Sequence, residues 1–305
     1  MRKPWLKYLL LILLGLLISE LLLRGLLGMG QLPLYQSSPD YEYALQADQS
    51  MKRFAKRFEI NEHGMRSAPL ESGEFRVLKF GDSVLNGGVA TDQEELATHL
   101  LEQGLHDAFP HLKARVLQVS AGSWGPDNAF AWMREHGHFE ARIIGLLFSS
   151  HDYRDHMDFR QVVGNVPFYP DRQPRTAIGD LFTWLYARYG PAVDWEQLPG
   201  APQGPEPKGP NSGWADFAAY CHEEGIALYA YHHPSYSEWR SGQWSAEGDS
   251  LQALLQRLEI PCINGLHTAY SEASWRDEIH PNALGQQAIA AAIMPRLIRE
   301  IESLP

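Results

Sequence analysis

Two short segments, far apart in the chain, carry side chains that together can make a hydroxyl group nucleophilic. Ser83 closes a Gly-Asp-Ser tripeptide directly after the apolar run 75–80, while Asp277 and His280 lie three positions apart near the other end. A histidine can accept the serine proton, and an aspartate can orient the imidazole and stabilise its cationic form. Each segment alone is a weak signal, but together they predict acyl-transfer chemistry at Ser83.

These residues need a scaffold that brings them together, and the hydropathy pattern predicts one. Apolar runs alternate with segments of helical periodicity. The predicted strands are 75–80, 114–119, 141–149, 226–231 and 261–263, and the predicted helices are 94–109, 127–135, 214–224, 250–258 and 282–301. Strands that alternate with helices form a parallel sheet covered on both faces. Ligands bind at the carboxyl ends of such strands, which is where Ser83 lies.

The segments after the second and third predicted strands supply further candidates. Gly122 follows the second strand. Its backbone N–H and that of Ser83 are the natural donors to the oxyanion of a tetrahedral intermediate, and loss of one such donor typically lowers the rate ~100- to 1000-fold. His151 and Asp152 follow the third strand. The run 151–158 has no recognised zinc spacing, so no metal site is expected there.

This set of motifs resembles the SGNH (GDSL-like) hydrolase superfamily. The first block matches at Ser83 and the two residues before it, the second-block glycine at Gly122, and the last block at Asp277 and His280. The resemblance implies a three-layer α/β/α sandwich with a parallel, flavodoxin-like sheet. It also implies ester chemistry through an acyl-enzyme on Ser83, without a metal or organic cofactor.

The third block departs from the Gly-x-Asn-Asp pattern of that family. Ser149 stands for the glycine and His151 for the asparagine, while Asp152 matches. The asparagine normally supplies an oxyanion donor, and a ring N–H of His151 can donate from the same place. The change bears on catalytic efficiency or reaction type.

The N-terminal segment 1–30 is typical of an uncleaved signal-anchor. It is rich in leucine on all faces of a helix and long enough to span a bilayer. Arg2, Lys3 and Lys7 favour a cytoplasmic N-terminus, and Glu20 can pair with Arg24 four residues later. An anchor of this kind predicts a single-pass protein of a bacterial inner membrane, with the rest of the chain in the periplasm.

The remainder divides into a polar linker and lead-in at 31–70 and a hydrolase-like domain at 71–305. Within that domain the regular alternation breaks at about 155–212, in a proline-rich insertion with one short helix near 178–189. The insertion is rich in aromatic side chains. These can pack the segment onto the domain, the favoured interpretation, or stack on sugar rings above the site.

Composition and isolated motifs bound the remaining possibilities. A formal charge of −11 and the lack of a basic patch beyond the N-terminus argue against a nucleic-acid partner. Cys221 and Cys262 can form a disulfide in an exported chain or stay as thiols, and the sequence leaves both open. His232 and His233 precede Pro234, and a strand-end turn is favoured over substrate contact.

These observations favour a serine-dependent esterase or deacylase that is anchored in a membrane and acts on an ester, with acylated envelope or exopolysaccharide as a candidate. An O-acyltransferase differs only in its acceptor, because a glycan hydroxyl replaces water. The altered third block also motivates a different hypothesis, a non-catalytic partner in polysaccharide modification.

Overall fold

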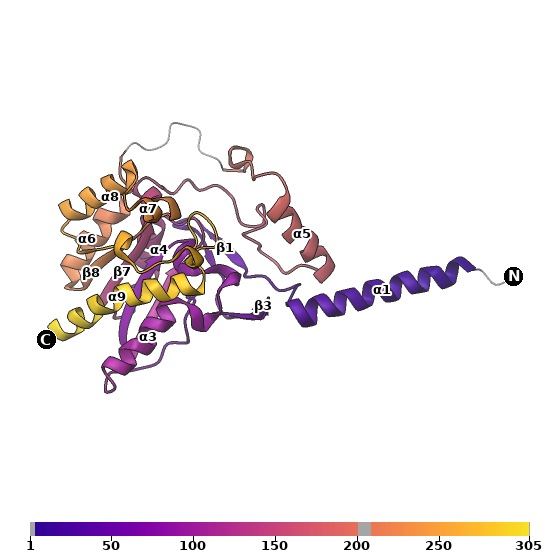
Figure 1. Cartoon of the computed structure of the whole chain (residues 1–305), viewed down its shortest axis with the longest axis horizontal. Coiled ribbons are helices and arrows are strands. Elements are labelled where there is room, and N and C mark those ends of the chain that lie inside the picture. Colours follow the sequence, from indigo (N-terminus) through magenta and orange to yellow (C-terminus); the bar gives the residue numbers. More distant parts are fainter. Residues whose placement is uncertain (1–3, 201–208, 305) are drawn as a thin grey trace.

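Five parallel strands form the central sheet of the computed structural model, which describes residues 4–200 and 209–304 (Figure 1). They are β5 (Phe75–Gly81), β6 (Ala114–Ser120), β7 (Ile143–Ser149), β8 (Ala227–His233) and β9 (Cys262–Asn264). Their spatial order is β6-β5-β7-β8-β9. Counted along the sheet-forming strands this is 2-1-3-4-5, the flavodoxin-like order. The predicted α/β fold is therefore confirmed.

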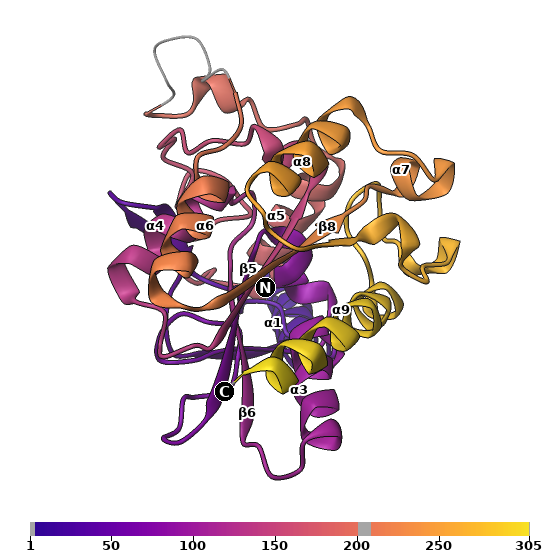
Figure 2. The same ribbon diagram turned by 90° about the vertical axis from the view of Figure 1, so that its left-hand side faces the viewer.

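Helices cover both faces of this sheet, which gives three layers (Figures 1 and 2). One face carries α3 (Ala97–Ala108) and α9 (Ala283–Ser303), and the other carries α4 (Pro126–His136), α6 (Gly213–Glu224) and α8 (Ala246–Arg257). Every residue of β7 is buried, as expected for a strand with helices on both sides. Three further helices are α2 (Ser83–Asn86), α5 (Ala177–Tyr189) and α7 (Tyr236–Ser241).

The segment 31–70, predicted as a polar linker and lead-in, holds two antiparallel hairpins. They pair β1 (Tyr35–Ser38) with β2 (Glu42–Leu45), and β3 (Gln49–Arg53) with β4 (Lys56–Ile60). Tyr41, Tyr43 and Phe58 are buried in the core cluster on the α4 side of the sheet. Strands of four or five residues are too short to show a clear alternation in the sequence. The division of the chain into domains stays a prediction.

The N-terminal helix α1 (Pro4–Leu27) extends away from the sheet domain (Figure 1). Its span Trp5–Leu27 has a mean hydropathy of 2.3 and none of the span is buried, so by length and composition it can cross a membrane. The predicted pair is formed, with Arg24 Nε 2.7 Å from Glu20 Oε1. Arg2 and Lys3 lie outside the described residues, as does the part 201–208 of the insertion.

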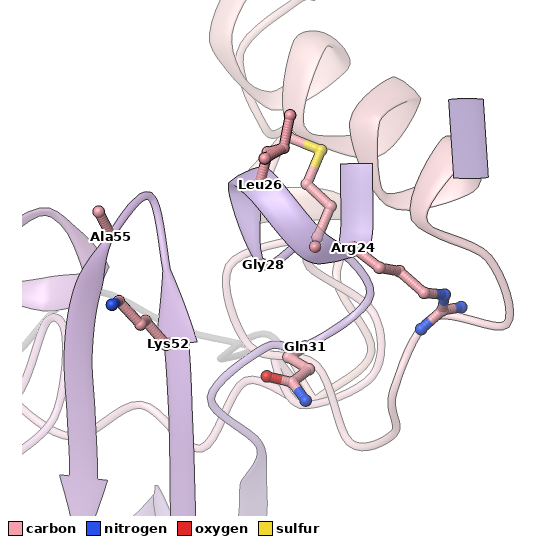
Figure 3. A pocket seen from close by; sticks show the side chains of 8 residues that line it. Arg24, Leu26, Gly28, Gln31, Lys52 and Ala55 are labelled. Carbon is pink, nitrogen blue, oxygen red and sulfur yellow. The ribbon is translucent and has the colours of Figure 1, made fainter. Parts of the chain in front are cut away.

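The end of α1 is joined tightly to the β3–β4 hairpin. Gly28 has a φ of 65°, and a Cβ at this position would lie 1.8 Å from the carbonyl oxygen of Lys52, so only glycine fits. A pocket of about 380 Å³ lies at this junction (Figure 3), lined by Arg24, Gly25, Leu26, Gly28, Met29, Gln31, Lys52 and Ala55. The helix is therefore continuous with the fold through specific contacts.

The predicted helix of the insertion is α5, and its N-terminus rests against α1. The Glu20 carboxylate accepts hydrogen bonds from the backbone N–H groups of Ala177 and Ile178, at 2.7 and 3.0 Å. Below it, the buried Asp180 forms a two-point ion pair with Arg53 of β3. Cys221 and Cys262 are both free thiols.

A lysine lies in the middle of the sheet without a charged partner. Lys79 of β5 is fully buried, and its Nζ donates to Tyr229 Oη at 3.1 Å in a slot opposite Gly145. Burial lowers the pKa of Lys79 to about 7. Above pH 7 the folded chain releases this proton while the unfolded chain keeps it up to its ordinary pKa near 10.5.

Stability is therefore expected to rise with pH above about 7, by about 1.4 kcal/mol per pH unit from this residue. The variant Lys79→Met should lose that rise and be more stable than the natural chain at pH 7. Urea unfolding at pH 7, 8 and 9 tests this, with Lys113→Met as the exposed control. An equal pH dependence in the natural chain and in Lys79→Met would contradict the assignment.

Candidate active site

The three residues singled out from the sequence form one hydrogen-bonded chain. His280 Nε2 lies 2.9 Å from Ser83 Oγ, and His280 Nδ1 lies 2.9 and 3.0 Å from the two carboxylate oxygens of Asp277. The carboxylate requires the proton on Nδ1, so Nε2 is free to accept from the serine hydroxyl. This arrangement can remove a proton from Ser83 as its oxygen attacks a carbonyl.

The turn after β5 presents the serine. Ser83 is the first residue of α2, and the Asp82 side chain caps this short helix by accepting from Val84 N at 2.8 Å. A Cβ on Gly81 would lie 2.6 Å from the carbonyl oxygen of Leu147. The glycine therefore lets β5 and β7 close beneath the turn, and the serine stands at the carboxyl edge of the sheet.

Backbone contacts hold the loop that carries the histidine. Asp277 Oδ1 accepts from the backbone N–H groups of Ile279 and His280 at 3.0 and 2.8 Å. Partial burial opposes ionisation of Asp277, but these two bonds and the nearby His280 ring outweigh it and lower the pKa of the carboxyl. Asp277 is therefore a carboxylate at neutral pH.

His233 supports the same loop from below. Its Nε2 donates to the carbonyl oxygen of Ile279 at 2.9 Å, and its Nδ1 accepts from Tyr270 Oη at 3.1 Å. Burial lowers the pKa of His233 to about 4, so the ring is neutral. His232 and His233 are both buried, and neither lines the cleft around Ser83. This agrees with the structural role favoured from the sequence.

Gly122 faces the same cleft as Ser83. Among the described residues, no backbone acceptor is found for the N–H of Ser83 or of Gly122, so both donors are available. Tyr43 Oη donates to the Gly122 carbonyl at 2.8 Å, which fixes this peptide from the β1–β2 hairpin. A Cβ on Gly122 would lie 3.2 Å from Tyr169 Oη, a tight contact that favours glycine.

The cleft has a volume of about 740 Å³, and its walls come from segments that lie far apart in the sequence. It is lined by Tyr35, Ser83, Asn86, Gly88, Ala90, Gly122, Ser123, Phe168, Tyr169, Arg188, Trp195, Arg276, Asp277 and His280. The hairpin β1–β2 and the insertion thus wall a site whose reactive groups come from the sheet edge.

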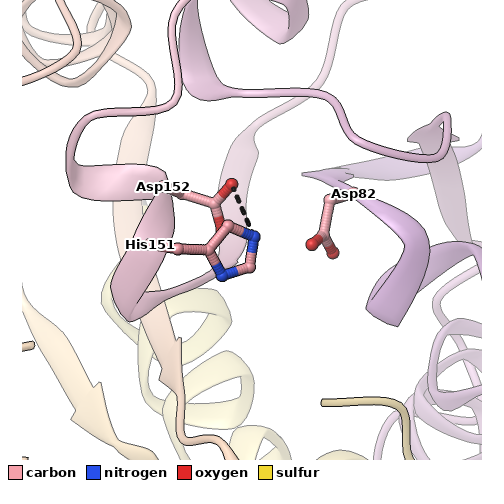
Figure 4. A group of neighbouring side chains, drawn as sticks. All are labelled: Asp82, His151 and Asp152. Atoms are coloured by element: carbon pink, nitrogen blue, oxygen red, sulfur yellow. Dashed lines mark ion pairs between the residues drawn. The ribbon is translucent and has the colours of Figure 1, made fainter. Parts of the chain in front are cut away.

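His151 is placed beside Asp82 and Asp152 instead of in the cleft lining (Figure 4). Its Nε2 lies 3.7 Å from Asp152 Oδ1. The oxyanion role predicted for His151 stays a prediction. Ligand atoms of the three residues lie within 4.8 Å of one another, a spacing that can hold a metal ion.

The protonation of this cluster bears on that possibility. Burial, and then the charge of Asp152, raises the pKa of Asp82 to about 8. Burial, and then Asp155, also raises the pKa of Asp152 well above its usual range. Carboxyls must lose their protons to bind a metal. Without a cation the Asp82 carboxyl is therefore mostly neutral at pH 7.

A second set of serine, histidine and carboxylate side chains is buried nearby. Ser150 Oγ lies 2.7 Å from Glu238 Oε1 and 3.0 Å from His232 Nε2. Here the serine contacts both partners, whereas a catalytic relay places the histidine between serine and carboxylate. The ring of His232 also stacks on Trp244 at 3.6 Å. This set lines none of the pockets described here, and it joins β7, β8 and α7 structurally.

Arg66 fixes the loop that follows the serine. This buried guanidinium donates to the carbonyl oxygens of Asn86, Gly88 and Thr91, the last two at 2.8 Å. It also stacks 4.1 Å from the centre of the Phe58 ring. The lead-in segment 61–66 thereby shapes one wall of the cleft.

The variant Arg66→Met is expected to unfold more easily by about 2–4 kcal/mol, because buried carbonyl groups lose their donor. Displacement of the loop by about 1 Å should lower the turnover of any ester substrate ~100-fold. Urea denaturation and steady-state kinetics measure both effects. The control is Arg172→Met, an exposed arginine. An Arg66 variant with natural turnover would show that the loop holds its shape unaided.

The sequence did not point to several cleft residues. Tyr35, Arg188 and Arg276 belong to no motif of the sequence, whereas Tyr169 is one of the aromatic residues of the insertion. Arg276 in fact donates to the Gly87 carbonyl at 3.2 Å. Its position directly before Asp277 was the one available signal.

The chain resembles the SGNH hydrolases. The likeness lies in the strand order and in the motif residues that meet at Ser83. No family model matches the sequence, and no curated protein matches it either.

Several solved structures resemble this chain at low sequence identity. One is a two-domain esterase active on acetylated mannans, with 12% identity and a TM-score of 0.45 over 76% of this chain and 51% of that chain. TesA shows 12% identity and a TM-score of 0.45 over 74% of this chain and 99% of its own. The lipase/acylhydrolase from Enterococcus faecalis shows 14% identity and a TM-score of 0.42 over 73% of this chain and 95% of its own.

Proposed function

We propose that this chain is a serine-dependent ester hydrolase in which Ser83, His280 and Asp277 form the catalytic triad. The observation that carries the proposal is the unbroken chain of hydrogen bonds from the Asp277 carboxylate through the His280 ring to Ser83 Oγ. It opens onto a cleft with two N–H donors that have no backbone acceptor within residues 4–200 and 209–304, which is what acyl chemistry requires.

The reaction follows from these positions. Ser83 Oγ attacks the ester carbonyl while its proton moves to His280 Nε2, and the N–H groups of Ser83 and Gly122 stabilise the oxyanion. His280 then returns the proton to the departing alcohol, leaving an acyl group on Ser83. Water, deprotonated by His280, attacks this acyl-enzyme and releases the acid.

The proposal includes a location. The apolar α1 anchors the chain in a bacterial inner membrane, and the domain lies on the periplasmic side. The open cleft of about 740 Å³ has room for a large alcohol such as a saccharide, in keeping with the acylated polysaccharide predicted from the sequence.

A fluorophosphonate probe tests the catalytic proposal on the full chain in detergent. We expect one covalent label, located on Ser83 by peptide mapping, with parallel loss of p-nitrophenyl ester hydrolysis. A reference serine hydrolase serves as the positive control. If the reference labels fully while Ser83 stays unlabelled, the non-catalytic alternative replaces this proposal. Free acid as product indicates a hydrolase, and acyl transfer to an added glycan indicates a transferase.

A further inference from the structure

A second cavity adjoins the cleft and has a different character. It has a volume of about 240 Å³ and shares Tyr35, Asn86, Gly88 and Phe168 with the cleft around Ser83. From these shared residues it runs beneath α5, away from the triad. The other lining residues are Leu32, Pro33, Arg53, Phe58, Val89, Pro167, Pro170, Asp180, Thr183, Trp184 and Ala187.

The lining offers little to a polar ligand. Most of its side chains are apolar or aromatic, and its one pair of charges is already satisfied. The Asp180 carboxylate accepts hydrogen bonds from Nη1 and Nη2 of Arg53 and from the backbone N–H of Gly30, at 2.5 to 3.0 Å. Such a cavity favours a hydrocarbon chain. If each water-sized group takes up about 30 Å³, the cavity has room for about eight such groups.

Helix α5, which covers this cavity, lies next to α1, the helix that can cross a membrane. Glu20, which caps α5, belongs to the candidate span of α1. A bilayer core of about 30 Å takes up about 20 residues of such a helix, so Glu20 and the first turn of α5 fall near the lipid headgroups. Arg24 and Lys52 line the pocket at the same end (Figure 3), as expected for cations at this depth.

The outer face of α5 fits the same position. Phe182 is 66% exposed and Tyr189 75%, and Tyr186 is also exposed. Exposed aromatic clusters are unusual on a surface that faces only water, whereas such side chains gather at the membrane interface. The cavity therefore lies between the residues it shares with the catalytic cleft and a helix whose other face exposes aromatic side chains.

We infer that this cavity binds the acyl chain of the substrate, a chain of about six to eight carbons carried by a membrane-borne ester. The inference rests on the proposed function and adds the class of acyl group. The ester carbonyl lies at Ser83, the alcohol occupies the open cleft, and the chain passes Phe168 into the space under α5. An acetyl ester would leave this space unfilled.

The test uses the full chain in nanodiscs of phosphatidylethanolamine and phosphatidylglycerol. Methyl and octyl fluorophosphonates place alkyl groups of different length in the acyl position of Ser83, so their labelling rates report on the cavity. We expect the octyl probe to label about tenfold faster or more. The variant Ala187→Phe fills the cavity and should abolish this advantage while leaving methyl labelling within about twofold.

Tyr186→Trp adds bulk on the exposed face of the same helix and should keep the advantage. Because both variants are measured in nanodiscs of the same lipids, the partitioning of the octyl probe into the bilayer is equal for the two and does not affect their comparison. Equal rates for the two probes, or an octyl advantage untouched by Ala187→Phe, would overturn the acyl site and leave the esterase proposal standing. Absence of labelling by either probe would overturn the esterase proposal itself.

Discussion

The variant Ser83→Ala is expected to lower kcat for ester hydrolysis by about 10⁴-fold or more, with little change in stability. Removal of the hydroxyl eliminates the acyl-enzyme route, whereas the oxyanion donors and the cleft remain. The serine makes one side-chain hydrogen bond, to His280, so its loss leaves no buried group of the core unpaired. Steady-state hydrolysis of a p-nitrophenyl ester by the full chain measures the effect.

The matched control is Ser150→Ala, because Ser150 also bonds to a histidine and lies near a carboxylate. This variant is expected to keep kcat within about threefold, although it loses two buried hydrogen bonds worth about 1 kcal/mol each. A reversed pattern, with turnover lost in Ser150→Ala and kept in Ser83→Ala, would move the nucleophile to the second set.

The variant Asp180→Ala is expected to cost about 3–5 kcal/mol in the stability of the α5 region, because it leaves the Arg53 guanidinium buried without its carboxylate. Both side chains are 2% exposed, so water does not replace the lost partner. We expect α5 to detach from the hairpin β3–β4 before the sheet unfolds. Hydrogen exchange of the amides in 177–189 should then become at least tenfold faster.

The double variant Arg53→Met/Asp180→Leu separates charge from packing. Replacing both members of a buried ion pair by apolar side chains is often neutral, so exchange in α5 should return close to that of the natural chain. If Asp180→Ala leaves exchange in α5 unchanged, the pair does not hold the helix, and the contacts of Glu20 must suffice.

The sheet was predictable because most of its strands are largely buried and rich in apolar residues. The limits of β5, β6, β7, β8 and β9 lie within two residues of the predicted ones. Ser83, Asp277 and His280 could be found as well, because the Gly-Asp-Ser tripeptide and the Asp-x-x-His segment are local patterns at predictable sheet edges. The sequence could not show that these two segments meet. The hydrogen-bond distances in the structure show that they do.

The walls of the site were not predictable, for a physical reason. Tyr35 and Tyr43 belong to strands of four residues. Such a strand holds only two repeats of the apolar and polar alternation that marks a strand in the sequence. Their role depends on long-range packing against Gly122 and Tyr169. The sequence could not show that the ring of His151 lies beside Asp82 and Asp152 either, because that contact joins two different strand ends.

The capping of α5 by Glu20 has a practical consequence for biochemistry. Preparations that delete the hydrophobic leader to gain solubility would also remove two acceptors for the amides of Ala177 and Ile178. Gly30, which donates to Asp180, is lost as well if the cut falls after it. Such trimmed material would keep its nucleophile yet report a weakened preference for long acyl groups, so chain-length profiles should be taken from the intact polypeptide.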